Sequence, residues 1–400
     1  MALISISGNK YLIYPIIGGL CKLIVNVIVF LISGKLQLDD HPFCSGINAG
    51  LGMSLAFIPY LIISKYEKNK KEELLFENLD IITEDKKEPN LNKGKYLIIF
   101  LCAFLDFLQK IIVYMFCSHI YTNISLFNII FLYLFSLIID KFDLYRHHYI
   151  SGGIMIVSGI GLNVMNLLII KVNQIPFLFL SIFIEITYSL CIVLAKYGIE
   201  HKSCSPFEIT FYEGIFALVL NIIFLAISSN IPLSKNFKYL NILKVSEYNG
   251  NKYLDHFSSY FPKMSLTEIL LFIATLIGRV SFNIFTHLTL KHLNIFHVMF
   301  ILIIGEITLN WKGKKIHEII LTAVILVIEL FMLLILCEIL ELNFCELNKN
   351  TQKNMKKMKQ FIIYDDDSKD SKEMYNELEL NIYTDTAKSS KLTFNNFLGI

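Results

Sequence analysis

Ionisable side chains interrupt long apolar stretches of this sequence, and their spacing places them on single helix faces. Asp106, Gln109 and Lys110 are three and four residues apart, and Tyr114 continues the same face. An ionisable group inside a membrane costs roughly 2.5–3.5 kcal/mol, so it requires a partner, water or a solute. The stripe predicts the wall of a polar cavity with a built-in ion pair. The alternative is a structural Asp106–Lys110 pair that neutralises itself.

A second polar stripe consists of Arg279, Asn283 and His287, which follow one another at intervals of four residues. Arg279 has no carboxylate within one turn of its own helix, so it must reach another helix, a bound anion or water. Contact with a substrate is one interpretation. The alternative is a structural salt bridge to one of the carboxylates of Glu185, Glu213 and Glu306.

Other apolar stretches contribute single polar groups. Lys22 and Asn26 are one helical turn apart, whereas Lys196 lies near the end of its stretch and is expected to extend to the membrane surface. Gly46, Gly50 and Ser54 form a stripe of small residues, which predicts tight helix contact. The complete set of substrate-path candidates is Lys22, Asn26, Asp106, Gln109, Lys110, Tyr114, Asn128, Glu185, Tyr188, Glu213, Arg279, Asn283 and His287.

Catalytic and metal-binding motifs are absent from the sequence. It contains no HExxH, no GxSxG and no phosphate-cradling glycine loop. The eight cysteines are scattered without a CxxC pair, and we interpret them as apolar core residues. His147 and His148 are adjacent, so their rings are expected to point apart and to face lipid headgroups. We therefore expect no enzyme activity, no cofactor, no metal and no nucleic-acid partner.

The composition is that of a membrane protein. The 400 residues are 54% hydrophobic and 18% charged, whereas soluble domains are nearer 25% charged. The net charge of +2 indicates no partner. Long apolar runs predict an all-α membrane protein with about ten transmembrane helices. The expected spans are 11–32, 43–64, 96–118, 122–139, 149–170, 177–199, 208–228, 266–288, 294–311 and 317–340.

Several of these stretches resemble the drug/metabolite transporter superfamily (EamA-like), and in particular its nucleotide-sugar-transporter-like solute carriers. The segment Leu134–Tyr149 is similar to the family's hairpin between helices 4 and 5, in which Ser136, Lys141, Leu144 and Tyr149 match. Three further elements resemble family helices: Asp106 with Tyr114, the run from Pro206 through Glu213-Gly214 to Phe216, and Phe282-Asn283. Arginines common in the family's helices 4 and 9 are missing here, which leaves the substrate type open.

The resemblance and the span count together predict two inverted five-helix repeats. The first covers 1–170 with a charged loop at 65–95, and the second covers 177–340 with a polar loop at 229–263. Spans 3 and 8 would be symmetry mates, so both polar stripes should face one central cavity. Residues 341–400 read as a mostly disordered tail, and the lysine distribution favours cytoplasmic termini.

The resemblance implies a secondary active transporter that moves a small organic solute by alternating access in an endomembrane, by exchange or with proton coupling. The alternative is a transport-inactive membrane scaffold or receptor that retains the fold, and the missing arginines favour it. Expected partners are the lipid bilayer and the solute, with a homodimer as one expected assembly. Tyr375–Leu378 matches a Tyr-x-x-apolar signal for a sorting adaptor, although such tetrapeptides also arise by chance.

Overall fold

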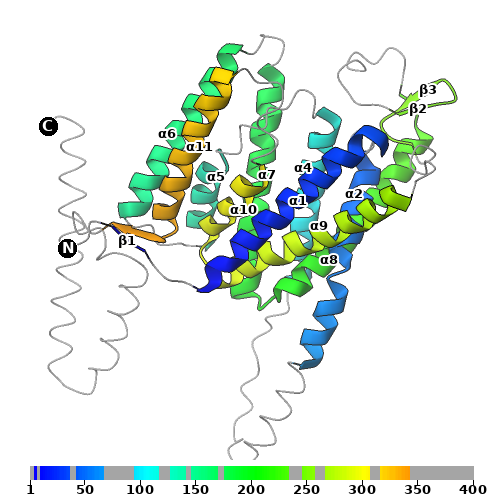
Figure 1. The fold of residues 1–400 in the computed structure, drawn as a ribbon. Coiled ribbons are helices and arrows are strands. Elements are labelled where there is room, and N and C mark those ends of the chain that lie inside the picture. Colours follow the sequence, from blue (N-terminus) through cyan, green and yellow to red (C-terminus); the bar gives the residue numbers. More distant parts are fainter. Residues whose placement is uncertain are drawn as a thin grey trace, which may run out of the picture. The chain divides into compact units, whose positions relative to one another are not determined.

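The structure is a computed structural model and is mostly helical (Figure 1). It describes residues 4–6, 10–36, 42–66, 94–116, 127–140, 146–169, 175–233, 246–256, 266–306 and 316–342. The labelled α-helices are α1 (Ile13–Leu36), α2 (Pro42–Ser54), α4 (Lys95–Phe116), α5 (Phe127–Phe135), α6 (Arg146–Ile169), α7 (Ile175–His201), α8 (Pro206–Asn230), α9 (Leu266–His292), α10 (Val298–Glu306) and α11 (Ile316–Leu336), and residues 57–66 are also helical.

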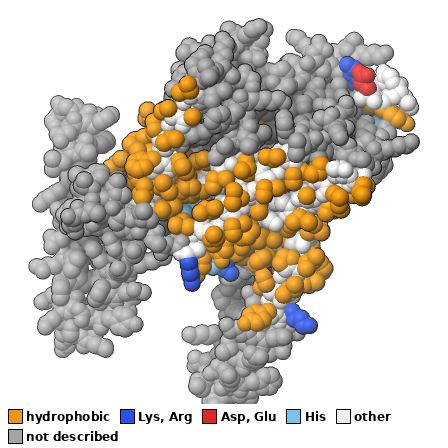
Figure 2. All heavy atoms as spheres, in the orientation of Figure 1, with side chains coloured by type: hydrophobic (Ala, Val, Ile, Leu, Met, Phe, Trp, Pro, Cys, Tyr) orange, Lys and Arg blue, Asp and Glu red, His pale blue; other side chains and the backbone are white. Residues whose placement is uncertain are grey.

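Five stretches of helix are long and apolar enough to cross a membrane. They are Lys10–Val29, Ser45–Tyr66, Ile182–His201, Pro206–Asn230 and Ile269–His292, and shorter apolar helices cover Asn128–Ile139, Ile295–Gly305 and Val327–Leu336. Large apolar side chains such as Ile138 and Val157 are about 70% exposed. Figure 2 shows hydrophobic side chains gathered over the face that contains α1 and α9. An apolar surface of this kind suits lipid rather than water, as expected for a membrane protein.

The helices pack through contacts between segments that are far apart in the sequence. α1 packs on α9 and α10, α4 packs on α7 and α8, and α2 packs on α8 and α9. α6 packs on α5 and α11. The larger hydrophobic core contains the fully buried side chains of Leu132, Met155, Val193, Met299 and Leu333. This core therefore joins α5, α6, α7, α10 and α11.

The crossing of α2 and α8 is close because glycines stand at the contact. A Cβ atom on Gly214 would lie 2.6 Å from the Ser54 nitrogen and 2.8 Å from the Met53 carbonyl carbon. A Cβ atom on Gly50 would lie 2.8 Å from the Leu218 nitrogen. Only glycine allows two backbones to approach this closely. The prediction of tight helix contact at the small-residue stripe is confirmed.

Several predicted spans are interrupted or end elsewhere. The second span breaks at a turn of Leu55 and Ala56 before helix resumes over 57–66, where Pro59 occupies the first turn that tolerates it. The fourth continues from α5 into a π-helix, Ser136–Asp140, and the ninth begins as a 3-10 helix, Ile295–His297. α11 ends at Leu336 rather than at residue 340, and Glu338 has a left-handed φ of 56°.

Two small antiparallel sheets correct the all-α expectation. In the predicted polar loop 229–263, β2 (Ser246–Tyr248) and β3 (Asn251–Tyr253) form a hairpin. Its turn residues Asn249 and Gly250 both have positive φ, which suits the twist of a tight hairpin. β1 (Ile4–Ile6) pairs with β4 (Leu340–Leu342) in a unit separate from the helical unit of residues 8–339.

Parts of the sequence-based predictions lie outside the described residues. They include most of the charged loop, the hinge residues Lys141 and Leu144, and the tail beyond residue 342 with Tyr375–Leu378. The structure reaches the predicted tail only at β4, where Glu341 and Leu342 pair with β1 instead of remaining irregular.

Candidate functional site

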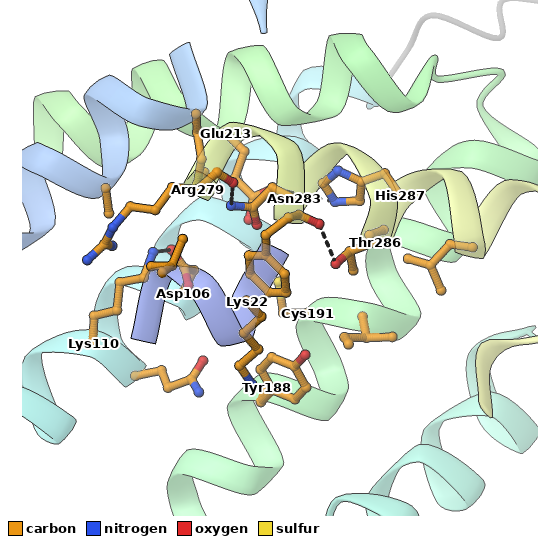
Figure 3. A pocket seen from close by; sticks show the side chains of 18 of the residues that line it. Lys22, Asp106, Lys110, Tyr188, Cys191, Glu213, Arg279, Asn283, Thr286 and His287 are labelled. Atoms are coloured by element: carbon orange, nitrogen blue, oxygen red, sulfur yellow. Dashed lines mark hydrogen bonds and ion pairs between the residues drawn. The ribbon is translucent and has the colours of Figure 1, made fainter. Parts of the chain in front are cut away.

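A cavity of about 290 Å³ lies within the helical unit (Figure 3). It is lined by residues of α1, α2 and α4 from the first half of the chain and of α7, α8 and α9 from the second half. Its polar lining consists of Lys22, Asn26, Asp106, Gln109, Lys110, Tyr188, Cys191, Glu213, Arg279, Asn283, Thr286 and His287. The polar lining side chains come from α4 and from α1, α7, α8 and α9, and the last four contain stretches long and apolar enough to cross a membrane.

Most of the substrate-path candidates lie around this cavity. Ten of the thirteen line it, and they include Asp106 and Lys110 of one stripe with all of Arg279, Asn283 and His287 of the other. Their role in transport stays a prediction. Asn128 lies elsewhere, buried between α5 and α7, where the Ser189 hydroxyl donates to its Oδ1 at 3.1 Å. Glu185 is not among the lining residues, and the Tyr114 side chain is outside the described part of the structure.

The acidic groups of the cavity lie beside basic groups. Asp106 and Lys110 form the ion pair that their i, i+4 spacing predicts. Glu213 Oε2 lies 3.7 Å from His287 Nε2, and His287 Nδ1 lies 2.8 Å from the Thr210 hydroxyl. That hydroxyl donates its single hydrogen to the Pro206 carbonyl, so His287 Nδ1–H is the donor to Thr210. The other ring nitrogen, Nε2, therefore faces the Glu213 carboxyl group.

Arg279 differs from the other charged groups of the cavity. Within the described part of the chain, its buried Nε has no hydrogen-bond partner and its guanidinium makes no ion pair with a carboxylate. The salt bridge to Glu213 is not formed, because Glu213 lies against His287 instead. The Glu306 side chain is outside the described residues. An unmet donor of this kind is costly when buried, and a water or an anionic group in the cavity would satisfy it.

The polar residues of α1 are held by α10. Asn26 Nδ2 donates to the Gly305 carbonyl at 2.7 Å, and the Lys22 stem packs where a Cβ atom on Gly305 would stand. The Lys22 ammonium lies 6.0 Å from the centroid of the Phe282 ring. These contacts direct the Lys22 side chain from α1 toward α9 at the cavity wall.

Sequence reasoning missed two polar residues of the lining, Cys191 and Thr286. Each lies three residues after a candidate that was identified, Tyr188 and Asn283, so the helical spacing could have found both. The Cys191 thiol donates to the Cys102 carbonyl and the Cys102 thiol to the Cys191 carbonyl, both at 3.6 Å. This reciprocal pair ties α7 to α4 beside the cavity.

Two lysines near the cavity, Lys95 and Lys196, bond to groups at the ends of neighbouring helices. Lys95 Nζ lies 2.7 Å from Glu208 Oε2, where Glu208 also completes the capping box of α8. Burial lowers the pKa of Lys95, but the hydrogen bond and charge of Glu208 outweigh it and raise the pKa above its ordinary value. Lys196 donates to the carbonyls of Leu290 and Leu293 at 2.6 and 3.0 Å. The expectation that Lys196 extends to the membrane surface is therefore wrong, because it caps the end of α9.

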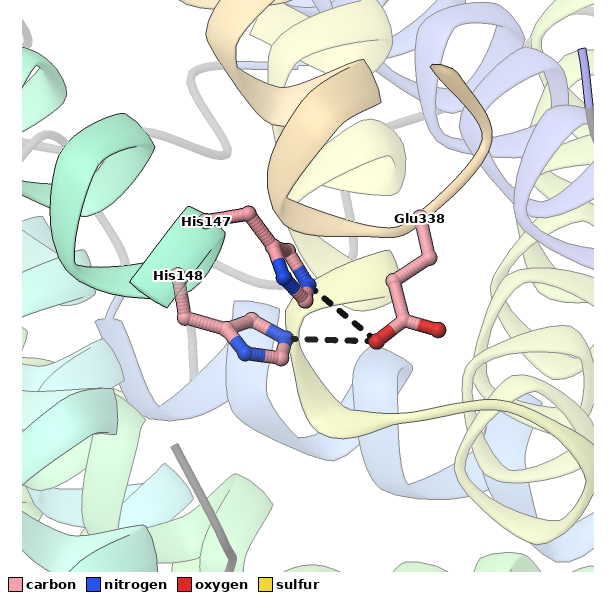
Figure 4. A group of neighbouring side chains, drawn as sticks. All are labelled: His147, His148 and Glu338. Atoms are coloured by element: carbon pink, nitrogen blue, oxygen red, sulfur yellow. Dashed lines mark hydrogen bonds and ion pairs between the residues drawn. The ribbon is translucent and has the colours of Figure 1, made fainter. Parts of the chain in front are cut away.

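The two adjacent histidines correct a second expectation. His147 and His148 belong to the first turn of α6, both are buried, and their ring centroids are 4.0 Å apart. Both rings turn toward Glu338, which follows α11 (Figure 4). Neighbouring positions on a helix diverge at Cα, but the rotamers of these long side chains bring the rings together. Burial, with a contribution from His147, lowers the pKa of His148 to about 3.

No protein-family model matches this chain, and no curated protein matches its sequence. The similarity to drug/metabolite transporters therefore remains the resemblance carried by the quoted motifs.

Proposed function

We propose that this chain is a secondary active transporter of the drug/metabolite type, which moves a small organic solute by alternating access. The observation that carries the proposal is one cavity lined by charged and polar side chains from helices of both halves of the chain, most of them long and apolar enough to cross a membrane. Transporters built from repeats bind their substrates between the halves, where polar groups line water or solute. A cavity of about 290 Å³ is near the lower limit of pockets that hold small molecules.

The packing of the helices supports ten spans arranged as two inverted five-helix repeats. In chain order, the first five labelled helices are α1, α2, α4, α5 and α6, and the second five are α7, α8, α9, α10 and α11. If each helix of the first five is exchanged with the helix at the same position in the second five, most of the strong helix–helix contacts are converted into one another. The contact of α1 with α9 corresponds to that of α7 with α4, and α1 with α10 to α7 with α5. Likewise, α2 with α9 corresponds to α8 with α4, and α5 with α6 to α10 with α11. The contacts α2–α8 and α6–α11 map onto themselves, as a pseudo-two-fold axis requires.

The charges of the cavity support a solute with an anionic group. Among the described lining residues, Lys22, Lys110 and Arg279 are basic, whereas Asp106 and Glu213 are acidic. The Asp106–Lys110 pair leaves Arg279 as a cation without a carboxylate partner in the described structure. A guanidinium offers a planar fork of donors that matches carboxylate and phosphate groups. Arg279 therefore supplies a positive charge that the family arginines missing from helices 4 and 9 would otherwise provide.

The Glu213–His287 pair supports coupling to protons. Because His287 Nδ1 is engaged by Thr210, the proton that can come and go belongs to Nε2 or to the Glu213 carboxyl. Both groups are buried, so binding or releasing that proton changes the charge next to the solute. Solute and proton binding would then affect one another. We further propose that the protein is multi-pass, lies in an endomembrane and has cytoplasmic termini, following the lysine distribution.

Uptake into proteoliposomes of the purified full-length chain tests this function. The panel would contain nucleotide sugars, nucleotides, amino acids and cationic drugs, each with and without an imposed pH gradient. We expect saturable uptake of an anionic member and no uptake by protein-free liposomes. Uptake restricted to cationic drugs would contradict the charge argument. Absence of uptake across the panel, by protein that remains monodisperse, would favour a scaffold or receptor.

A further inference from the structure

His147, His148 and Glu338 converge on one point that the transport path does not use. His147 Nε2 lies 3.1 Å from Glu338 Oε1, and His148 Nε2 lies 3.9 Å from the same oxygen (Figure 4). One ligand atom from each residue lies within 4.8 Å of the other two. We propose that these three side chains form a binding site for a divalent transition-metal ion, with Zn²⁺ as the expected occupant.

The separations of the Glu338 oxygen from the two imidazole nitrogens are close to those between ligands of one tetrahedral ion. Zinc binds imidazole nitrogen and carboxylate oxygen at about 2.0–2.2 Å, so neighbouring ligands of a tetrahedral site are about 3.3 Å apart. The observed separations of 3.1 and 3.9 Å lie on either side of this value. Two imidazoles with one carboxylate form a borderline donor set, which suits zinc and related first-row ions rather than Mg²⁺ or Ca²⁺.

The backbone around the histidines is fixed independently of any ion. The Tyr133 hydroxyl donates to the His148 carbonyl, and the Ser151 hydroxyl donates to the His147 carbonyl at 2.6 Å. The His148 ring also lies 6.2 Å from the Phe296 ring, centroid to centroid. Ligands whose backbone and rings are already held lose little freedom when they bind a metal.

The two histidine side chains make the site largely dry, and the partly exposed Glu338 side chain leaves an approach to it. The side chain of His148 is fully buried and that of His147 is 5% exposed, whereas the Glu338 side chain is 12% exposed. An ion can therefore reach the site past the carboxylate, and a water can complete its coordination. The site joins the beginning of α6 to the residue that follows α11, so a bound ion would cross-link these two helices.

Zinc binding by the purified full-length chain tests the proposal directly. After treatment with a chelator, the protein is titrated with ZnCl₂, and with MgCl₂ and CaCl₂ for comparison, while its melting temperature is followed. Glu338→Gln keeps the size of the side chain but removes its charge, and His148→Asn removes one imidazole. His201→Asn serves as the matched control, because His201 is an exposed residue at the end of α7. Co²⁺ loading of the wild type gives a spectroscopic signal that is independent of stability.

We expect Zn²⁺, but not Mg²⁺ or Ca²⁺, to raise the melting temperature of the wild type and of His201→Asn. Glu338→Gln and His148→Asn should weaken zinc binding by more than the roughly 10–100-fold that loss of a supporting residue costs. Co²⁺ should give the visible absorption of a tetrahedral site. Unchanged zinc affinity in Glu338→Gln, or a wild type that binds neither Zn²⁺ nor Co²⁺, would overturn the proposal. The cluster would then be a histidine–carboxylate hydrogen bond only.

Discussion

The polar cavity and the His147–His148–Glu338 cluster lie on different helices and meet the cost of buried polar groups in different ways. Around the cavity, charged side chains of α1, α4, α8 and α9 line a volume of about 290 Å³, and Arg279 has no carboxylate partner among the described residues. In the cluster, three ligand atoms approach within 4.8 Å of one another. The first arrangement leaves room for an organic solute to enter and leave, whereas the second fits a single ion held by converging ligands.

This difference separates a site that binds and releases a solute from a site that holds an ion in place. A transport site must bind its solute strongly enough to accept it but weakly enough to release it, so an unmet donor beside open volume is useful there. A metal site that cross-links two helices gains from ligands whose positions are already set. If the comparison is correct, substitutions in the cavity should alter uptake and leave zinc binding unchanged, and substitutions in the cluster should do the opposite.

Removal of Arg279 should have the largest effect. Arg279→Ala is expected to abolish uptake while the protein remains folded, because the cavity loses a cation that has no carboxylate partner among the described residues. Arg279→Lys should restore uptake poorly, since a point charge does not reproduce the planar fork of a guanidinium. Uptake into proteoliposomes measures both variants, and Lys252→Ala on the exposed hairpin is the control for loss of a positive charge. Normal uptake by Arg279→Ala would contradict the proposal that Arg279 supplies the positive charge for an anionic solute.

The paired charges of the cavity offer a second test. Lys110→Met leaves Asp106 without its partner and should lower uptake of an anionic solute about tenfold, through a repulsion of order 1.4 kcal/mol. The double variant Asp106→Asn with Lys110→Met removes both charges and should recover most of the uptake. Concentration dependence of uptake distinguishes weaker solute binding from slower turnover. A double variant as poor as Lys110→Met would mean that the pair acts through packing rather than charge.

The parts of the site that follow helical spacing could be predicted from the sequence. The faces of Asp106 with Lys110 and of Arg279 with His287 depend only on the period of the helix, and the structure places all four beside one cavity. The tight crossing at Gly50 could be predicted for the same reason. Asn249-Gly250 is typical of a hairpin turn, but the polarity of the surrounding residues led to the prediction of a loop.

The cluster could not be predicted, because it depends on packing between distant segments. His147 and Glu338 are separated by 191 positions, and they meet only because α6 packs on α11. Adjacency of the two histidines suggested diverging rings, but their rotamers and the Glu338 carboxylate decide the outcome. The turn at Leu55–Ala56 was missed, although Pro59, which cannot donate to the Leu55 carbonyl four residues before it, is a sequence sign of such a break.

Glycine substitutions compare the packing of the two regions. Gly214→Ala at the α2–α8 crossing should destabilise the protein by about 1–3 kcal/mol, because its Cβ meets backbone atoms that cannot move aside. Gly153→Ala on α6 is the matched control, since nothing lies within 4 Å of its Cβ position. Melting temperatures in one detergent give the comparison, with Gly153→Ala expected at or above the wild type. Equal effects of the two substitutions would show that the crossing has room to relax.

Tyr133→Phe should have the smallest effect and the most specific one. It removes the hydroxyl that donates to the His148 carbonyl, so unfolding should become easier by about 1 kcal/mol. Without that hydrogen bond, the first turn of α6 positions the two imidazoles less well, and zinc affinity should fall about tenfold. Tyr248→Phe on the exposed hairpin controls for loss of a hydroxyl. Lower stability with unchanged zinc affinity would mean that Glu338 and ring packing alone set the ligand positions. Lost uptake would instead show that the cluster affects the cavity, because a change at the contact of α5 with α6 would then have altered the helices that line the proposed solute path.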